Sequence, residues 1–205
     1  SFERANESRR EMEGVNVKLL KKSETDQKTG LANRYRLNDY SDKVLDYCYE
    51  HRLPLAMEIL DIDFFKQYND NYGHQQGDEC IIAIADELKK MEDRQTFCAR
   101  YGGDEFIIIY AGASAEEVYA KAAALRQNIM DLKLEHLYSK ALPIVTISQG
   151  ISYGVPEEGN RSWDFLHTAD MLLYQVKKKS RNDICIADIR GQELDLSSKQ
   201  EKVEP

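Results

Sequence analysis

"ARYGGDEFIIIY" (residues 99–110) places two glycines and two acids between apolar segments. The apolar runs on either side are typical of strands, and a Gly-Gly pair tolerates the positive φ angles of a tight hairpin turn. We therefore predict two antiparallel strands joined at Gly102 and Gly103. The second strand then begins with Asp104 and Glu105, so two carboxylates lie at the open end of a buried hairpin.

A second apolar run also ends in acids. The segment LPLAMEILDID (residues 53–63) reads as a mostly buried strand that ends with Asp61 and Asp63, whose side chains share one face because they are two residues apart. If this strand neighbours the hairpin, carboxylates from both strands converge and raise one another's pKa values. Such a cluster, with few nitrogen or sulfur ligands nearby, suits Mg²⁺.

The remaining pattern predicts an α+β fold. Helices are expected at about residues 34–51, 78–91, 114–134 and 163–179, and further strands at 143–154 and 184–186. Between the first strand and the second of these helices we expect a short helical turn and a loop broken at Gly73 and Gly77. Without its additions, the order is strand, helix, strand, strand, helix, strand, which is that of a ferredoxin-like antiparallel sheet. We expect the helices to pack around this sheet, on one face.

The two ends of the chain differ from its central part. Residues 2–24 are rich in charged side chains and carry Met12, Val15 and Leu19 at helical spacing, which predicts a lead-in helix. This helix is either the start of a coiled coil or a solvated terminal helix. From Arg190 onward the chain is polar, and we expect it to be disordered. The predicted organisation is a linker helix at 1–25, one domain at 26–189 and a tail at 190–205.

Composition excludes several classes of partner. The chain of 205 residues has a formal net charge of -8 and a pI near 5.1, which argues against nucleic-acid polymers and anionic membrane surfaces. The four cysteines lie far apart without a CxxC pair, as in a reduced cytosolic protein. No apolar stretch approaches the roughly 18 residues of a membrane span. We expect no membrane contact by this fragment and a cytoplasmic location, alone or as the cytoplasmic part of a larger sensor protein.

Several polar residues fit a nucleoside triphosphate. Lys66 follows DIDFF at the start of a helical turn, where free N–H groups face outward, while Lys177 and Arg181 lie four residues apart near the end of the last helix. Asn69 and Asp78 offer oxygens that accept from the donors on guanine, which adenine lacks. Each pattern also has a structural interpretation, since DxD is often a helix cap, Gly-Gly often only a hairpin, and KKK often a solvated helix face.

Taken together, these residues resemble the GGDEF family, the diguanylate cyclases, over roughly residues 26–186. Four ordered blocks carry the resemblance: TGLANR, DIDFFKQYNDNYGHQQGD, RYGGDEF and ADMLLYQVKKKSRN. The resemblance implies a fold related to nucleotidyl cyclases and polymerase palms. It also implies a reaction in which two GTP molecules condense to cyclic di-GMP and two pyrophosphates.

The resemblance implies a role for each matching residue. Asp61, the backbone carbonyl of Ile62 and Asp104 match the ligands of Mg²⁺, or of Mn²⁺ in its place. Glu105 is either a further ligand or the group that helps to deprotonate the attacking 3′-hydroxyl, whereas Asp63 is structural. The residues implied to act in catalysis are Asp104, Glu105 and Lys66. Those implied to bind the substrate are Phe64, Phe65, Lys66, Asn69, Asp78, Lys177 and Arg181. We also expect His74, Arg100, Gly102 and Gly103 to contact the substrate, since His74 lies in the glycine-flanked loop and the other three lie at the turn before Asp104.

One domain of this family holds one GTP and so supplies half of an active site. The resemblance therefore implies a two-fold homodimer, lasting or transient, in which each 3′-hydroxyl faces the partner's α-phosphate. The lead-in helix is where an upstream sensor would set this geometry. The alternative is a catalytically silent module that binds GTP or serves for dimerisation and signalling. An enzyme that uses ATP or mixed nucleotides is a third option, against which Asp78 counts.

Some positions depart from the family pattern. Many members carry an RxxD inhibitory site before the signature, but Asp93 and Thr96 occupy its first and last positions here. We therefore expect no RxxD inhibitory site and no product inhibition through it. Lys28 replaces a usual leucine, Gln149 an apolar residue and Ser180 a usual glycine. Because these three lie outside the metal-binding and base-binding positions, we expect them to affect packing rather than chemistry.

Overall fold

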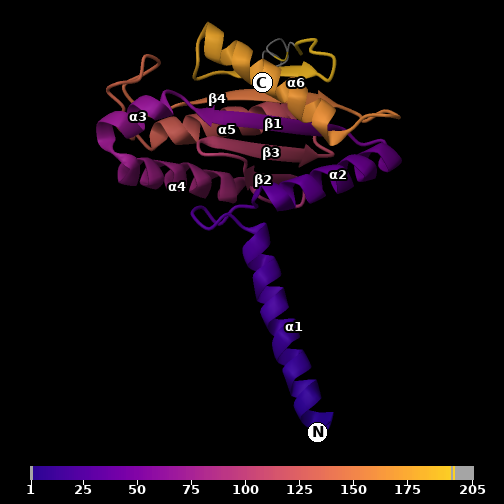
Figure 1. Ribbon diagram of the computed structural model, residues 1–205. Coiled ribbons are helices and arrows are strands. Elements are labelled where there is room, and N and C mark those ends of the chain that lie inside the picture. Colours follow the sequence, from indigo (N-terminus) through magenta and orange to yellow (C-terminus); the bar gives the residue numbers. More distant parts are fainter. Residues whose placement is uncertain (1, 195, 197–205) are drawn as a thin grey trace, which may run out of the picture.

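A five-stranded sheet lies at the centre of the molecule (Figure 1). The computed structural model describes residues 2–194 and 196. The strands are β1 (Leu55–Ile62), β2 (Thr96–Arg100), β3 (Glu105–Ala111), β4 (Ile147–Gly154) and β5 (Ile184–Asp188). The helices are α1 (Phe2–Glu24), α2 (Arg34–His51), α3 (Phe65–Tyr72), α4 (His74–Met91), α5 (Ala115–Asp131) and α6 (Ser162–Lys179).

The strand order is β2-β3-β1-β4-β5. The pairs β2–β3, β3–β1 and β1–β4 are antiparallel, in the ferredoxin-like arrangement that the sequence predicts. β5 instead pairs with β4 in parallel, because α6 carries the chain back along the sheet between these two strands. The predicted fold is therefore confirmed, but the sheet is mixed rather than antiparallel throughout.

Helices cover both faces of the sheet. Met57 and Ile59 of β1 pack in one core with residues of α2 and α6, whereas Ala56 and Leu60 pack in a second core with residues of α4 and α5. The prediction that the helices lie on one face is thus wrong. Every residue of β1 is buried, and its apolar run is nearly continuous because a strand covered on both faces does not alternate with polar residues.

The predicted hairpin of β2 and β3 is present, but its turn differs from the expectation. Neither Gly102 nor Gly103 has a positive φ angle. The connection spans residues 101–104, and a loop of this length does not need the left-handed geometry of a two-residue turn. The guanidinium group of Arg100 stabilises this loop instead, because it donates to the carbonyls of Gly102 (3.1 Å) and Gly103 (2.9 Å).

Two helices connect β1 to β2. The chain breaks at Gly73 (φ 89°), as predicted, but Gly77 lies inside α4, which begins at His74 rather than Asp78. A Cβ atom at Gly77 would lie only 1.8 Å from Oδ1 of Asn69 in α3. Gly77 therefore leaves room for the Asn69 side chain between α3 and α4, and does not interrupt a helix.

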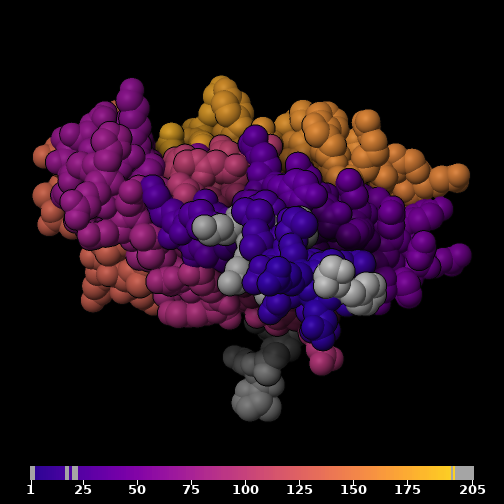
Figure 2. Space-filling model, turned by 60° about the horizontal axis from the view of Figure 1, so that its bottom comes forward, coloured from indigo at the N-terminus to yellow at the C-terminus, as the bar shows by residue number. Residues whose placement is uncertain are grey.

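The predicted lead-in helix is confirmed as α1, which projects away from the sheet (Figure 1). In Figure 2 the indigo N-terminal segment lies in front of the remainder of the molecule. Met12, Val15 and Leu19 are between 55% and 64% exposed, so the apolar stripe faces solvent in the single chain. None of the helices within residues 2–194 is long and apolar enough to cross a membrane.

The start of the polar tail is ordered. The N–H of Leu194 donates to the carbonyl of Ile186 in β5 (2.9 Å), and Glu193 forms a bridge with Ala187. The expectation of disorder is therefore not met just after Arg190. For residue 195 and residues 197–205 it lies outside the described residues.

Candidate functional site

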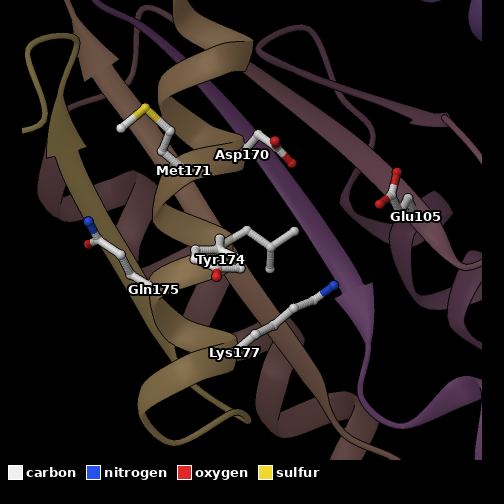
Figure 3. Close-up of a pocket in the computed structure, with 7 residues that line it drawn as sticks. Glu105, Asp170, Met171, Tyr174, Gln175 and Lys177 are labelled. Atoms are coloured by element: carbon white, nitrogen blue, oxygen red, sulfur yellow. The ribbon is translucent and has the colours of Figure 1, made fainter.

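Two pockets flank the start of β3. The first, the α3–α4 pocket, is a cavity of about 570 Å³ lined by Lys28, Phe65, Lys66, Asn69, Asp70, His74, Asp78, Ile81, Arg100, Gly103 and Asp104. The second, the α6 pocket, measures about 430 Å³ and is lined by Glu105, Asp170, Met171, Leu173, Tyr174, Gln175 and Lys177 (Figure 3). The adjacent acids Asp104 and Glu105 thus face different cavities.

The acids from β1 and β3 converge, as the sequence predicts. Asp61 lies directly opposite Glu105 in the register of the two strands, and the N–H of Ile62 donates to the carbonyl of Asp104 (3.3 Å). Burial and the neighbouring Asp104 carboxyl raise the pKa of Asp61 to about 7, although Lys177 acts in the opposite direction. Burial and the charge of Asp104 also raise the pKa of Glu105.

Lys177 belongs to both the acid cluster and the α6 pocket. Its ammonium group bonds to Oδ2 of Asp61, and Figure 3 shows its side chain extending from α6 across the pocket. Asp61 is only 6% exposed, so this ion pair is largely shielded from water. The position of Lys177 depends on α6 packing closely on β4.

A glycine in β4 permits this close packing. A Cβ atom at Gly150 would lie 2.3 Å from the carbonyl oxygen of Ala169 and 2.3 Å from the backbone nitrogen of Leu173. Both atoms belong to the backbone of α6, so no side-chain movement could make room. Gly150 therefore determines how near α6, and with it Lys177, lies to the strand ends.

The donor set at the strand ends fits a hard divalent cation. Oδ1 of Asp61 is buried and has no hydrogen-bond partner among the described residues. The carboxyl of Asp104 interacts with that of Asp61 and provides further oxygens beside it. Among residues 2–194 no group of three or more His, Cys, Asp and Glu side chains is arranged to hold a metal. Two adjacent carboxylates suit Mg²⁺, which usually keeps several waters and shares phosphate oxygens with its substrate.

Asp63 has a different environment from Asp61. Its carboxylate is fully buried and accepts hydrogen bonds from the hydroxyls of Thr146 (2.8 Å) and Ser148 (2.6 Å) and from the N–H of Asn182 (3.0 Å). These contacts tie the end of β1 to β4 and to the loop after α6. The structural role implied for Asp63 agrees with this geometry.

The turn between β1 and α3 has an unusual backbone. Phe64 adopts the left-handed conformation (φ 53°), which is rare for a residue with a large side chain. The guanidinium group of Arg181 lies 4.2 Å from the centre of the Phe64 ring, and Lys66 is exposed at the first turn of α3. Arg181 is thereby directed toward the turn that carries Lys66.

His136 supports the same turn and is absent from the predicted site. Its ring is buried, its Nε2 lies 2.9 Å from the carbonyl of Phe64, and its edge packs on Tyr68. Nothing in the spacing of the four histidines predicts this contact, because His136 is 72 residues away from Phe64. His74, the histidine expected at the site, lines the α3–α4 pocket.

The residues expected to read a base lie together in the α3–α4 pocket. Oδ1 of Asn69 is buried without a hydrogen-bond partner among the described residues. Asp78 binds Nζ of Lys28 at 2.5 Å. Lys28, which the sequence led us to expect in packing, has its ammonium group at the candidate base-binding carboxylate.

Arg100 and the two glycines have mainly a local role in the described contacts. Arg100 also lies 3.3 Å from the carboxylate of Asp26, which it connects to the β2–β3 turn. A Cβ atom at Gly103 would meet nothing within 4 Å, so the pocket wall is open there. Arg100 thus orients the turn, and Gly103 leaves space beside Asp104.

Comparisons with known proteins agree with this architecture. The family described as "Diguanylate cyclase, GGDEF domain" matches residues 23–183. Over 163 residues the chain is 34% identical to the "Probable diguanylate cyclase DgcC" of Escherichia coli K12, covering 78% of this chain and 42% of DgcC. It is 31% identical over 160 residues to the "Response regulator PleD" of Caulobacter vibrioides, covering 78% of this chain and 35% of PleD. The chain thus spans less than half the length of these relatives.

Solved structures give the same assignment of fold. The coiled coil and GGDEF domain of DgcB from Caulobacter crescentus, in complex with c-di-GMP, matches with a TM-score of 0.80 and 29% identity, covering 90% of this chain and 97% of that chain. SiaD from Pseudomonas aeruginosa, a diguanylate cyclase in complex with its activator SiaC, matches with a TM-score of 0.73 and 26% identity, covering 89% of this chain and 69% of SiaD.

Proposed function

Because the chain belongs to the GGDEF family, we propose that it is a diguanylate cyclase that condenses two GTP molecules into cyclic di-GMP and two pyrophosphates. The observation that carries this proposal is the position of Asp104, which lines the α3–α4 pocket and also interacts with Asp61 in β1. A nucleotide with its base in this pocket would present its phosphates to both carboxylates.

Asp61, Asp104 and the carbonyl of Ile62 are the proposed ligands of Mg²⁺, or of Mn²⁺ in its place. When bound, such an ion supplies positive charge to the phosphate oxygens and makes the attacking 3′-hydroxyl more acidic. The carboxylate of Glu105 lies beside this group, and burial and Asp104 raise its pKa. A raised pKa makes Glu105 a better acceptor for the 3′-hydroxyl proton.

The phosphates would lie over the turn between β1 and α3. Phe64 and Phe65 shape this turn, and no side chain of the described residues caps α3, so its first N–H groups can donate to phosphate oxygens. Lys66, Lys177 and Arg181 supply the cations around it. Lys177 is within reach of Asp61, so it can balance both the carboxylate and the phosphate charge as the reaction proceeds.

Asn69 and Asp78 are the proposed guanine readers. The unpartnered Oδ1 of Asn69 and the carboxylate of Asp78 are acceptors on one side of the α3–α4 pocket. Guanine offers N1–H and N2–H₂ donors to such acceptors, whereas adenine has no donor at N1. A buried acceptor left without its donor weakens binding, which favours GTP over ATP.

Catalysis requires two copies of the domain. Each copy provides one GTP, and each 3′-hydroxyl must attack the α-phosphate held by the other copy. We propose that α1, within a linker helix at residues 1–25, positions two domains (26–189) through its exposed stripe of Met12, Val15 and Leu19. Because GTP is a cytoplasmic nucleotide, the proposed location of this part of the protein is cytoplasmic.

The decisive experiment is incubation of the purified chain with GTP and Mg²⁺. We expect cyclic di-GMP and pyrophosphate in a 1:2 ratio, measured by chromatography, at protein concentrations where sedimentation shows dimers. The variant Asp104→Asn should lower product formation by about 100-fold or more, because it removes a charged metal ligand. Asp39→Asn, at an exposed site in α2, is the matched control and should retain activity.

A silent module would give a different result. GTP would then bind, as detected by calorimetry, but the dimer would form no cyclic di-GMP. Product formation that is unchanged in Asp104→Asn would contradict the metal assignment. Either result rejects the cyclase proposal or its proposed site.

A further inference from the structure

We propose that Lys28 is a specificity-determining residue that donates a hydrogen bond to O6 of guanine while Asp78 accepts from N1–H and N2–H₂. This inference rests on the proposed function, since it concerns how the same pocket recognises GTP. It assigns to the α3–α4 pocket a cation in addition to the two acceptors described above.

The first support is the contact between the two side chains. Nζ of Lys28 lies 2.5 Å from Oδ1 of Asp78, and both residues line the α3–α4 pocket together with Asn69. The Lys28 and Asp78 side chains are 36% and 48% exposed, and both line the cavity. A ligand in this cavity can therefore meet the ammonium group and the carboxylate at once.

The loop that carries Lys28 is anchored. The hydroxyl and the N–H of Thr29 both donate to the carboxylate of Asp26, at 2.7 and 2.9 Å. The carboxylate of Asp26 also accepts a hydrogen bond from the guanidinium group of Arg100, which donates to the carbonyl of Gly103 as well. These contacts connect the backbone around Lys28 to the turn that precedes Asp104. The loop that carries Lys28 is therefore fixed relative to the pocket.

The chemistry of guanine matches this pair of charges. Its edge presents an acceptor at O6 directly beside the donor at N1, followed by the donor at N2. A carboxylate that accepts from N1–H places one oxygen next to O6. An ammonium group bonded to that same oxygen is then close enough to donate to O6, and such a charge-assisted hydrogen bond is among the stronger ones.

Lys28 would also reject adenine. Adenine carries an amino group in place of O6, and an ammonium group opposite that donor has no acceptor. In the same position Asp78 would face the unprotonated N1 of adenine. Two mismatched polar contacts in one pocket discriminate more strongly than one, because each leaves a charged group without a partner.

The test separates O6 from the rest of the base with two GTP analogues. In 6-thio-GTP, sulfur, a weak acceptor, replaces O6 while N1–H and N2–H₂ remain; in ITP, O6 and N1–H remain but the amino group is missing. Calorimetry with Mg²⁺ should show that Lys28→Met weakens GTP binding about tenfold or more but changes 6-thio-GTP binding much less. The ratio of GTP to ITP affinity should stay as in the unaltered protein.

Lys43→Met is the matched control, because Lys43 forms an exposed ion pair with Asp39 (2.8 Å) outside this pocket. It should leave all three affinities unchanged. Equal weakening of GTP and 6-thio-GTP by Lys28→Met would mean that Lys28 acts only through overall charge or through Asp78, and would overturn the inference. No change in either affinity would do the same. Failure of the unaltered protein to bind GTP would overturn the proposed function as well.

Discussion

The ammonium group of Lys177, near the end of α6, bonds to the carboxylate of Asp61 at the end of β1. This single contact joins the last helix of the domain to the proposed metal site. In the proposed reaction each group also has a second partner. Asp61 would bind the metal ion, and Lys177 would bind phosphate. The contact therefore links substrate binding to the packing of α6.

Replacing Lys177 should make the protein more responsive to divalent ions. Lys177→Met leaves Asp61, which is 6% exposed, beside Asp104 without its cation, and we expect a loss of about 1–3 kcal/mol of stability in a metal-free buffer at pH 8. Adding Mg²⁺ should then raise the melting temperature more in the variant than in the unaltered protein. Scanning calorimetry with and without Mg²⁺ measures both effects.

The control for this prediction is Lys178→Met, at the exposed neighbouring position, which contacts the ring of Tyr174. It should show the Mg²⁺ response of the unaltered protein. An equal Mg²⁺ response in Lys177→Met would mean that Lys177 and the ion do not compete for Asp61.

The Gly150→Ala variant should displace α6. The new Cβ atom would lie 2.3 Å from backbone atoms of Ala169 and Leu173, so the helix must move away from β4. We expect a loss of about 1–3 kcal/mol or more in the free energy of unfolding, with reduced activity because Lys177 moves too. Gly154→Ala in the same strand meets nothing within 4 Å and should leave unfolding by urea nearly unchanged. Similar stabilities for the two variants would contradict this account.

The Gly77→Ala variant should separate nucleotide binding from stability. Its Cβ atom would overlap Oδ1 of Asn69, a side-chain atom that can rotate away, whereas alanine favours the helical backbone by about 0.5–1 kcal/mol. We therefore expect unchanged or higher stability with weaker GTP binding, measured by calorimetry. Gly14→Ala, a helical position with nothing within 4 Å, should change only helix stability. Full GTP affinity in Gly77→Ala would argue against Asn69 as a base reader.

A buried carboxyl predicts an unusual pH dependence. Glu58 is fully buried in the core, where Tyr110 and Gln149 donate to it at 2.8 and 2.6 Å. Burial raises the pKa of Glu58 from 4.5 to about 7, despite these hydrogen bonds. Between these values the folded protein holds a proton that the unfolded chain has lost, so stability falls as the pH rises through this window and levels off above it.

Glu58→Gln should remove this fall. Between pH 5 and pH 8, the difference in unfolding free energy between the variant and the unaltered protein should shift in favour of the variant by up to about 3 kcal/mol. Urea titrations at several pH values test this. Glu157→Gln, at an exposed position, should keep the original pH profile. Parallel profiles for all three proteins would show that Glu58 does not bind a proton on folding in this range.

The product should not inhibit the enzyme through the β2 edge. Asp93 and Thr96 occupy the first and last positions of the RxxD inhibitory site that many family members carry, and both contact Lys121. The carboxylate of Asp93 would repel a cyclic di-GMP phosphate, whereas an arginine would attract it. Initial rates measured with added cyclic di-GMP should therefore stay constant. A saturating fall in rate would reveal an inhibitory site elsewhere on the chain.

Local patterns in the sequence predicted much of this protein. The apolar runs and the order of the elements predicted the ferredoxin-like arrangement, in which β1 pairs with β3. The residues proposed to bind the base and the phosphates followed from short motifs within or next to α3, α4 and α6. All of these features depend on residues close together along the chain.

Contacts between distant residues were decided by the tertiary structure alone. Lys28 meets Asp78 across 50 residues, and Lys177 meets Asp61 across 116. The same is true of His136 behind Phe64. Such contacts depend on strand register and on how closely each helix packs on the sheet. The spacing of residues along the chain indicates neither the register nor this packing distance. The periodicity of the sequence therefore predicted the helices and strands, while tertiary packing determined which charged side chains contact one another.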